Sequence, residues 1–213
     1  MQRLVSQSMM PILYSYRRCP YAMRARMALH YAGIVVEHRE ISLREKPQSM
    51  LKVSPKGTVP VLCLPDRIID QSIDIIHWAL QQNDPYDWMQ ADPMLARGWI
   101  EKNDGPFKKL LDQYKYPNRF PGLDPREVLH QARVVMLDPL EAALQNHPYV
   151  MGSKITWVDI AIFPFIRQFS MVNIEQFSAL PLPATQDWLE QQLESNLFQA
   201  VMVKYPTWTD SIK

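Results

Sequence analysis

The periodicity of apolar residues changes once along this chain, near residue 83, and this change limits the fold more than any other feature. Before it, short apolar runs that are typical of strands alternate with segments of helical spacing. After it, only helical spacing remains, interrupted by Asp, Pro, Gly or Asn. A chain of 213 residues is long enough to bury two cores of this kind. The sequence therefore predicts an α/β domain followed by an all-helical domain.

The first part of the chain predicts a small mixed sheet with helices packed on it. The apolar runs predict strands at 11–16, 35–41, 59–64 and 67–70, and helical spacing predicts helices at 20–33 and 72–82. Pro65-Asp66 separates the last two strands and indicates a hairpin turn. We expect this domain to span residues 9–82.

The remainder of the chain predicts helices alone. The turn-rich stretch 83–92 suits an interdomain linker, so the helical domain is expected to span 93–213. Helical spacing recurs at 93–115, 124–145, 156–171, 183–193 and 195–203. Asp is a good N-cap and proline a good first helical residue, so the four Asp-Pro pairs that begin at residues 84, 92, 124 and 138 include several expected helix starts.

Composition excludes several classes of function. A formal net charge of +1 predicts no strong attraction to nucleic acid or to anionic lipid. No run of about 18 apolar residues occurs, so no membrane span is expected. The five histidines lack metal-like pairing with cysteine or carboxylate, so no metal site is expected. Two cysteines suit a reducing compartment, and we expect the cytoplasm.

Cys19, in "SYRRCPYAMRARMAL", is the first candidate for chemistry. It stands directly before Pro20, which favours Cys19 as the N-cap of the helix that follows. Helix amides would then point at the sulfur, and the positive helix end would favour a thiolate. Arginines at 17, 18 and 24 add to this if they face the sulfur. A Cys-Pro pair alone is equally compatible with a thiol that only packs.

The second thiol of a CxxC redox pair is missing. Ala22 occupies the position that a resolving cysteine would need. Cys19 can therefore form a mixed disulfide with a small thiol but cannot resolve it within this motif. The other cysteine, Cys63, lies in the apolar run "PVLCL" and is interpreted as a buried small hydrophobe.

Three further segments complete a constellation around Cys19. Val59-Pro60 precedes a strand, and a cis bond there would leave the Val59 backbone free for an extended peptide ligand. Gln71 and Ser72 begin a helix, where amides and a hydroxyl can hold a carboxylate. Lys46 could supply a cation. The simpler interpretations are capping by Ser72 and a solvated loop lysine at position 46.

The residues resemble the glutathione transferases, particularly the omega-like cysteine type. The matching segments are "RRCPYAMRARMAL", "LREKPQSMLKVSPKGTVPVL" and "DQSIDIIHWAL", in the family's order, and they cover most of residues 11–82. The same order is similar to the bacterial two-domain glutaredoxin. The second half resembles the family more loosely, through "KITWVDIAIFPFIR", where Thr156 and Asp159 form a capping box.

The resemblance implies a thioredoxin-like N-terminal domain that binds glutathione as co-substrate, beside a helical domain. Cys19 is then the catalytic thiol, and the Val59 backbone binds the cysteinyl part of glutathione. Gln71 and Ser72 hold the γ-glutamyl carboxylate, and Lys46 meets the glycyl carboxylate. Gln71 departs from the acid that many relatives carry at this position, which weakens its assignment slightly.

A cysteine-type member of the family is expected to catalyse thiol–disulfide exchange rather than conjugation. Its substrates are mixed disulfides, dehydroascorbate or aromatic ketone conjugates, and the enzyme is expected to be a homodimer. The second-substrate pocket would be lined from the aromatic and basic segment 99–120, by Trp99, Phe107, Lys108 and Tyr114. Helix packing is the competing interpretation of the same four residues.

Two alternatives stay open at the level of sequence. Tyr14 or Tyr16 could activate the glutathione thiol, as a tyrosine or serine does in other classes, although Cys19 occupies the helix start where that group belongs. The chain could also be a regulatory binding protein of the stringent-starvation type, with the transferase fold but without catalysis.

Overall fold

The computed structural model describes residues 10–210, which form two compact units. Within this range, unit 1 comprises residues 10–83 together with 200–210, and unit 2 comprises 84–199. The expected start of the first domain, residue 9, lies outside the described residues. Contacts group residues 200–210 with unit 1, whereas the sequence analysis expects the helical domain to span 93–213.

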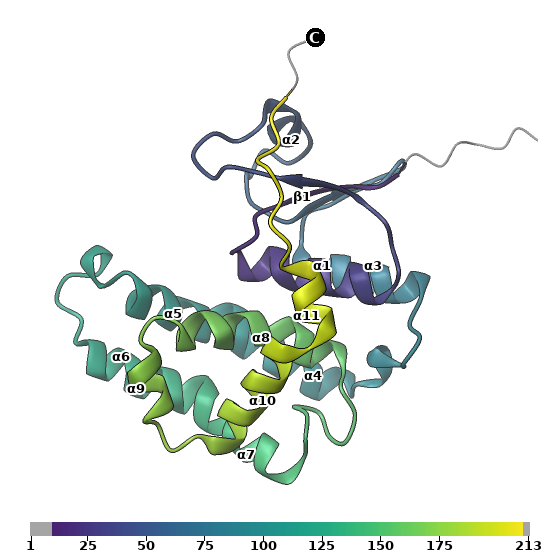
Figure 1. Ribbon diagram of the computed structural model, residues 1–213. Coiled ribbons are helices and arrows are strands. Elements are labelled where there is room, and N and C mark those ends of the chain that lie inside the picture. The colour runs from purple at the N-terminus through teal and green to yellow at the C-terminus, as the bar shows by residue number, and fades with distance from the viewer. Residues whose placement is uncertain (1–9, 211–213) are drawn as a thin grey trace, which may run out of the picture. The chain divides into compact units, whose positions relative to one another are not determined.

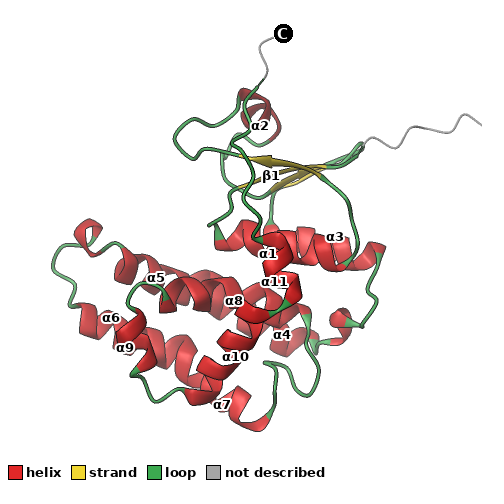
Figure 2. Cartoon of the chain, viewed as in Figure 1, coloured by secondary structure: helices red, strands yellow, loops and turns green. Residues whose placement is uncertain are grey.

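Unit 1 contains a four-stranded mixed sheet in the order β2-β1-β3-β4. The strands are β1 Ile12–Ser15, β2 Glu37–Glu40, β3 Val61–Cys63 and β4 Ile68–Ile69. β1 pairs in parallel with β2 and antiparallel with β3, and β3 pairs antiparallel with β4. Each predicted strand is present, and Figure 2 shows the sheet with its helices. The fold class is therefore confirmed.

The helices of unit 1 are α1 Pro20–Tyr31, α2 Gln48–Val53 and α3 Ser72–Gln82. α1 and α3 pack against each other and cover one face of the sheet, whereas α2 lies beyond the other face (Figure 1). A core cluster links the elements and consists of Tyr14, Ala22, Ile41, Met50, Val59 and Val61. Cys19 and Trp208 are partly buried and pack against this cluster.

Unit 2 is helical. Its helices are α4 Pro93–Lys102, α5 Lys108–Lys115, α6 Pro125–Ala132, α7 Asp138–Asn146, α8 Trp157–Ser170, α9 Ile174–Ser178 and α10 Pro183–Glu194, followed by α11 Asn196–Val201, which ends in unit 1. The short helix α9 was not expected, since five residues are too few to establish a helical period.

The polar punctuation of unit 2 acts largely as the sequence predicts. Asp92 caps α4 and Asp124 caps α6, each through its carboxylate. Asp138 instead continues a helical run, because a π-helical turn at Arg133–Leu137 joins α6 to α7 without a break. α8 begins with the predicted capping box between Thr156 and Asp159.

Candidate functional site

Cys19 lies at the N-terminus of α1, where the Cys-Pro pair predicts it. Its extended backbone makes it the N-cap residue, Pro20 is the first helical residue, and the Cys19 carbonyl accepts the first-turn bond from the Met23 amide at 2.9 Å. The thiol is half-buried and not in a disulfide. Its Sγ donates to the Val59 carbonyl oxygen at 3.7 Å. The thiol therefore lies at a positive helix end and faces the loop before β3, and its sulfur makes no capping hydrogen bond with the first amides of α1.

Arg26, two residues after Arg24 on α1, is the basic residue that sequence reasoning missed. It interacts electrostatically with Cys19, and burial lowers the pKa of its guanidinium to about 10. Arg18 bonds the Tyr16 hydroxyl, and Arg24 bonds Ser72. The only signal in the sequence is that Arg26 interrupts the apolar stripe of the helix 20–33.

The Val59-Pro60 peptide bond is cis, as the sequence suggested. Val59 is buried, and its carbonyl oxygen receives the Cys19 thiol. Two residues earlier, Gly57 adopts a left-handed backbone with φ of +61°, and a Cβ there would lie 3.2 Å from the Lys46 Nζ. The Lys46 side chain therefore lies over the turn that leads to Val59.

Gln71 and Ser72 stand at the start of α3, as predicted, but Ser72 does not cap the helix. Gln71 is the exposed N-cap residue, and its amide lies 3.4 Å from the Asp70 carboxylate. The buried Ser72 hydroxyl accepts a bond from Arg24 Nε at 2.9 Å. Because a guanidinium can only donate, the Ser72 hydroxyl keeps its own proton for an acceptor such as a carboxylate.

A carboxylate stands directly before Gln71. Asp70 pairs with Lys56 Nζ at 2.8 Å and accepts a bond from the Ser54 hydroxyl at 3.3 Å. The hydrogen bond from Lys56 is the main cause that lowers the pKa of Asp70. The ionised form of Asp70, which directly precedes Gln71, is therefore favoured in the folded protein.

Tyr14 and Cys63 belong to the core of unit 1. The buried Tyr14 hydroxyl donates to Ser49 Oγ at 2.9 Å and accepts from Arg39 at 2.7 Å, so a structural network uses it on both sides. Cys63 packs against the core cluster but is only half-buried, and this burial raises the pKa of its thiol.

The four candidates for a second-substrate pocket lie in unit 2. Phe107 has no exposed surface and packs on Phe169 at 5.5 Å between ring centroids, so its assignment to that pocket is corrected: it is a core residue. Tyr114 is partly exposed, stacks on Phe169 at 4.8 Å and bonds Gln176. Trp99 and Lys108 are also partly exposed, with Lys102 over the Trp99 ring and Asp112 paired with Lys108.

Across residues 10–210, no three His, Cys, Asp or Glu side chains cluster in a way that could hold a metal ion. No helix within the same range is both long and apolar enough to cross a bilayer.

Two family models match the chain. The glutathione S-transferase N-terminal domain matches residues 13–87, and the glutathione S-transferase C-terminal domain matches residues 126–196. Glutathione S-transferase DHAR2 of Arabidopsis thaliana is 30% identical over 148 residues, which cover 68% of this chain and 64% of that protein. The probable glutathione S-transferase parC of Nicotiana tabacum is 30% identical over 169 residues, which cover 74% of this chain and 72% of that protein.

The fold has the same relatives among solved structures. Glutathione transferase Omega 3C from Trametes versicolor superimposes with a TM-score of 0.75 over 92% of this chain and 90% of that chain, at 19% identity. Both family models, the relative from Nicotiana tabacum and the two-unit architecture agree. The chain belongs to the glutathione S-transferase family of enzymes.

Proposed function

We propose that this enzyme is a cysteine-type, omega-like glutathione transferase that catalyses glutathione-dependent thiol transfer through Cys19. The observation that carries the proposal is the position of the thiol. Cys19 is a half-buried N-cap residue of α1 and faces Val59 at the cis-proline loop. A helix N-terminus favours a thiolate, which is the nucleophilic form of cysteine.

The exchange proceeds in two balanced steps. The Cys19 thiolate attacks the glutathione sulfur of a mixed disulfide, so the substrate S–S bond breaks and a Cys19–glutathione disulfide forms. The substrate thiolate leaves and takes up a proton from solvent. A second glutathione thiolate then attacks this disulfide, which releases oxidised glutathione and restores the Cys19 thiolate. Because Ala22 occupies the position of a resolving cysteine, the nucleophile of the second step is a glutathione thiolate and not a second thiol of the enzyme.

In this proposal, further residues of unit 1 supply complementary groups for the glutathione co-substrate. Ser72 has a hydroxyl proton directed by Arg24, and with Gln71 and the first amides of α3 it can receive the γ-glutamyl carboxylate. The Val59 backbone lies beside the thiol, where the cysteinyl part must bind. Lys46, over the Gly57 turn, offers a cation for the glycyl carboxylate. The acid at Asp70 provides the negative charge that Gln71 lacks.

For the second-substrate pocket we retain three of the four candidate residues. Trp99, Lys108 and Tyr114 are partly exposed in unit 2 and remain our candidates for contact with an electrophilic or disulfide substrate. Phe107 is no longer a candidate, since it is completely buried.

Turnover of two contrasting substrates tests the proposal. Purified enzyme with reduced glutathione is assayed with the mixed disulfide of glutathione and 2-mercaptoethanol, and separately with 1-chloro-2,4-dinitrobenzene. We expect disulfide reduction to dominate and to be lost in Cys19→Ala. Cys63→Ala is the matched control and should keep full activity. Full activity of Cys19→Ala, or conjugation as the dominant reaction, contradicts the proposed function.

We further propose that the enzyme works in a reducing compartment such as the cytoplasm, since the reaction requires Cys19 as a free thiol. We also propose that it is a homodimer. Light scattering of the purified protein measures the assembly, and a monomer at micromolar concentration would contradict the dimer.

A further inference from the structure

The loop between β1 and α1 that delivers Cys19 is held by side chains from two other positions in unit 1. Arg26 NH1 donates to Ser15 Oγ at 2.7 Å and to the Tyr16 carbonyl at 3.4 Å, and its NH2 donates to the Arg17 carbonyl at 2.8 Å. Arg26 therefore binds three consecutive residues, Ser15, Tyr16 and Arg17, in the segment that leads to Cys19.

Glu40, the last residue of β2, also holds this loop, but its carboxylate accepts a hydrogen bond where the Arg26 guanidinium donates. Its Oε1 accepts the Arg17 amide at 2.6 Å, and its Oε2 lies 3.1 Å from His38 Nε2. The Cys19 amide closes the turn on the Tyr16 carbonyl at 3.0 Å. Both polar groups of the Arg17 backbone are thus fixed, the amide by Glu40 and the carbonyl by Arg26.

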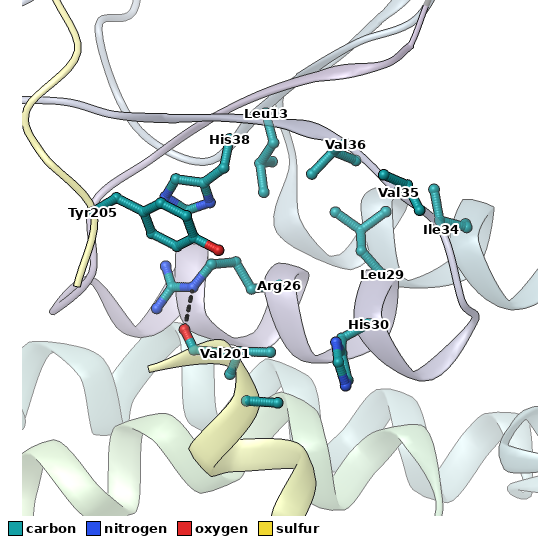
Figure 3. A pocket seen from close by; sticks show the side chains of 11 residues that line it. Leu13, Arg26, Leu29, His30, Ile34, Val35, Val36, His38, Val201 and Tyr205 are labelled. Atoms are coloured by element: carbon teal, nitrogen blue, oxygen red, sulfur yellow. Dashed lines mark hydrogen bonds between the residues drawn. The ribbon is translucent and has the colours of Figure 1, made fainter. Parts of the chain in front are cut away.

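We call Arg26 and Glu40 the clamp. Residues 201–210, the C-terminal strap, contact both of these residues. Arg26 Nε donates to the Val201 carbonyl at 3.1 Å, the dashed bond in Figure 3, and NH2 lies 3.8 Å from Met202 Sδ. The Trp208 amide donates to the Glu40 carbonyl at 2.7 Å. Figure 1 shows the strap in yellow as it leaves α11 and passes the sheet toward α2.

A cavity of about 270 Å³ adjoins the clamp, with Arg26, His38 and Tyr205 in its lining, and the Tyr205 ring stacks on His38 at 4.2 Å (Figure 3). All five N–H groups of Arg26 already have acceptors within unit 1. The guanidinium is therefore committed to the loop and the strap, and not to a ligand in this cavity.

Arg26 is also a buried charge that interacts electrostatically with Cys19. It is 5% exposed, and the charged or titratable groups that act on it are Glu40, Cys19, Arg17 and Tyr205. Its pKa, at about 10, keeps it protonated at neutral pH. A buried cation with a full set of hydrogen bonds has a fixed position, so its attraction for the Cys19 sulfur is fixed as well.

We propose that Arg26 and Glu40 are positioning residues for Cys19: together they fix the Tyr16–Arg17 backbone and so place the thiol at the N-terminus of α1. This inference rests on the proposed function for its catalytic meaning. A fork of donors in a rigid plane is needed to bind adjacent carbonyls, so lysine at position 26 cannot reproduce the clamp fully.

The test measures the reactivity of Cys19 without glutathione. Wild type, Arg26→Met, Arg26→Lys and Glu40→Ala are alkylated with iodoacetamide from pH 5 to 9, and the Cys19 peptide is quantified by mass spectrometry. Arg44→Met, at an exposed arginine of unit 1, is the matched control. We expect alkylation at pH 7 to fall about tenfold in Arg26→Met, with the midpoint of the pH–rate profile at higher pH. Arg26→Lys should recover part of the rate.

A folded Arg26→Met protein with the wild-type rate and profile overturns the inference. If Arg26→Met does not fold, Glu40→Ala decides. Amide hydrogen exchange at Arg17 should then accelerate and Cys19 alkylation should slow, and no change in either overturns the inference. Failure of the proposed function gives a different result, because Cys19→Ala would keep disulfide turnover while the alkylation differences persist.

Discussion

Each unit contains a buried charged side chain whose hydrogen bonds fix a loop, Arg26 in unit 1 and Asp159 in unit 2, and the two loops differ in what they carry. In unit 1, Arg26 donates to the backbone before Cys19. In unit 2, Asp159 accepts from the Val150 amide, the Thr156 amide and the Trp188 indole at 3.0 to 3.2 Å. The first loop ends at a half-buried thiol, and the second joins α7 to α8.

We expect Arg26 to affect the reactivity of Cys19 and Asp159 to affect only the stability of the fold. Asp159 has no exposed surface, and burial raises the pKa of its carboxyl despite the donors around it. Its removal should change the free energy of unfolding alone. Removal of the Arg26 clamp should change the reactivity of a neighbouring group as well. The comparison fails if removal of Arg26 and removal of Asp159 both change the reactivity of Cys19, or if neither does.

Cys19→Ser should produce the largest effect. We expect thiol transfer to fall by about 10³-fold or more, because a serine hydroxyl cannot form the mixed disulfide. Conjugation of 1-chloro-2,4-dinitrobenzene should not fall, since serine at a helix N-terminus can still bond a glutathione thiolate. Steady-state kinetics with the two substrates measures the split. A parallel loss of both activities would mean that the serine variant has lost its site and not only its nucleophile.

Asp159→Ala should lower the free energy of unfolding by roughly 3 kcal/mol, because several buried donors lose their acceptor. Urea unfolding monitored by circular dichroism measures the loss. Asp187→Ala, at an exposed position of α10, is the control and should stay within about 0.5 kcal/mol of wild type. Equal losses of unfolding free energy in the two variants would contradict the stabilising role of the Asp159 hydrogen bonds.

Ser72→Ala should weaken glutathione binding roughly tenfold, the effect of one hydrogen bond to a charged group. The rate of Cys19 alkylation should stay at the wild-type value, because Ser72 contacts Arg24 and not the Arg26 clamp. Calorimetric titration with glutathione, together with alkylation of the free enzyme, checks both statements. Unchanged affinity would exclude Ser72 from the glutathione site.

The Asp70–Lys56 pair should give the smallest effect. Lys56 holds the pKa of Asp70 below its usual value, so the ionised carboxylate is favoured in the folded protein. Its stabilisation is present above about pH 4 and is lost as the pH falls through the lowered folded pKa. Lys56 is half-exposed, so the contribution stays below about 1 kcal/mol.

Thermal unfolding of wild type and Lys56→Met between pH 6 and pH 3 tests this pair. The difference in unfolding temperature should narrow as the pH falls. A difference that stays constant over this range would show that Lys56 acts through packing rather than through the charge of Asp70.

Local patterns in the sequence were sufficient for the features that depend on neighbours along the chain. The Cys-Pro pair predicted the N-cap at Cys19, Val59-Pro60 suggested the cis bond, and Thr156 with Asp159 predicted the capping box. In each case the residues that determine the feature are neighbours along the chain.

Features that depend on distant partners could not be predicted. Arg26 reaches Val201, 175 positions away, and Ser49 is bonded by Asp210, 161 positions away. No periodicity encodes such pairs, so the strap was assigned to the helical domain that it follows.

The most direct test of the central claim is mass spectrometry of the enzyme after reaction with oxidised glutathione. We expect one glutathione adduct per chain, mapped to Cys19 and not to Cys63, which reduced glutathione removes. The Cys63→Ala protein should form the same adduct, and the Cys19→Ala protein should form none. An enzyme that forms no adduct at Cys19, or forms it only at Cys63, would contradict the assignment of Cys19 as the nucleophile.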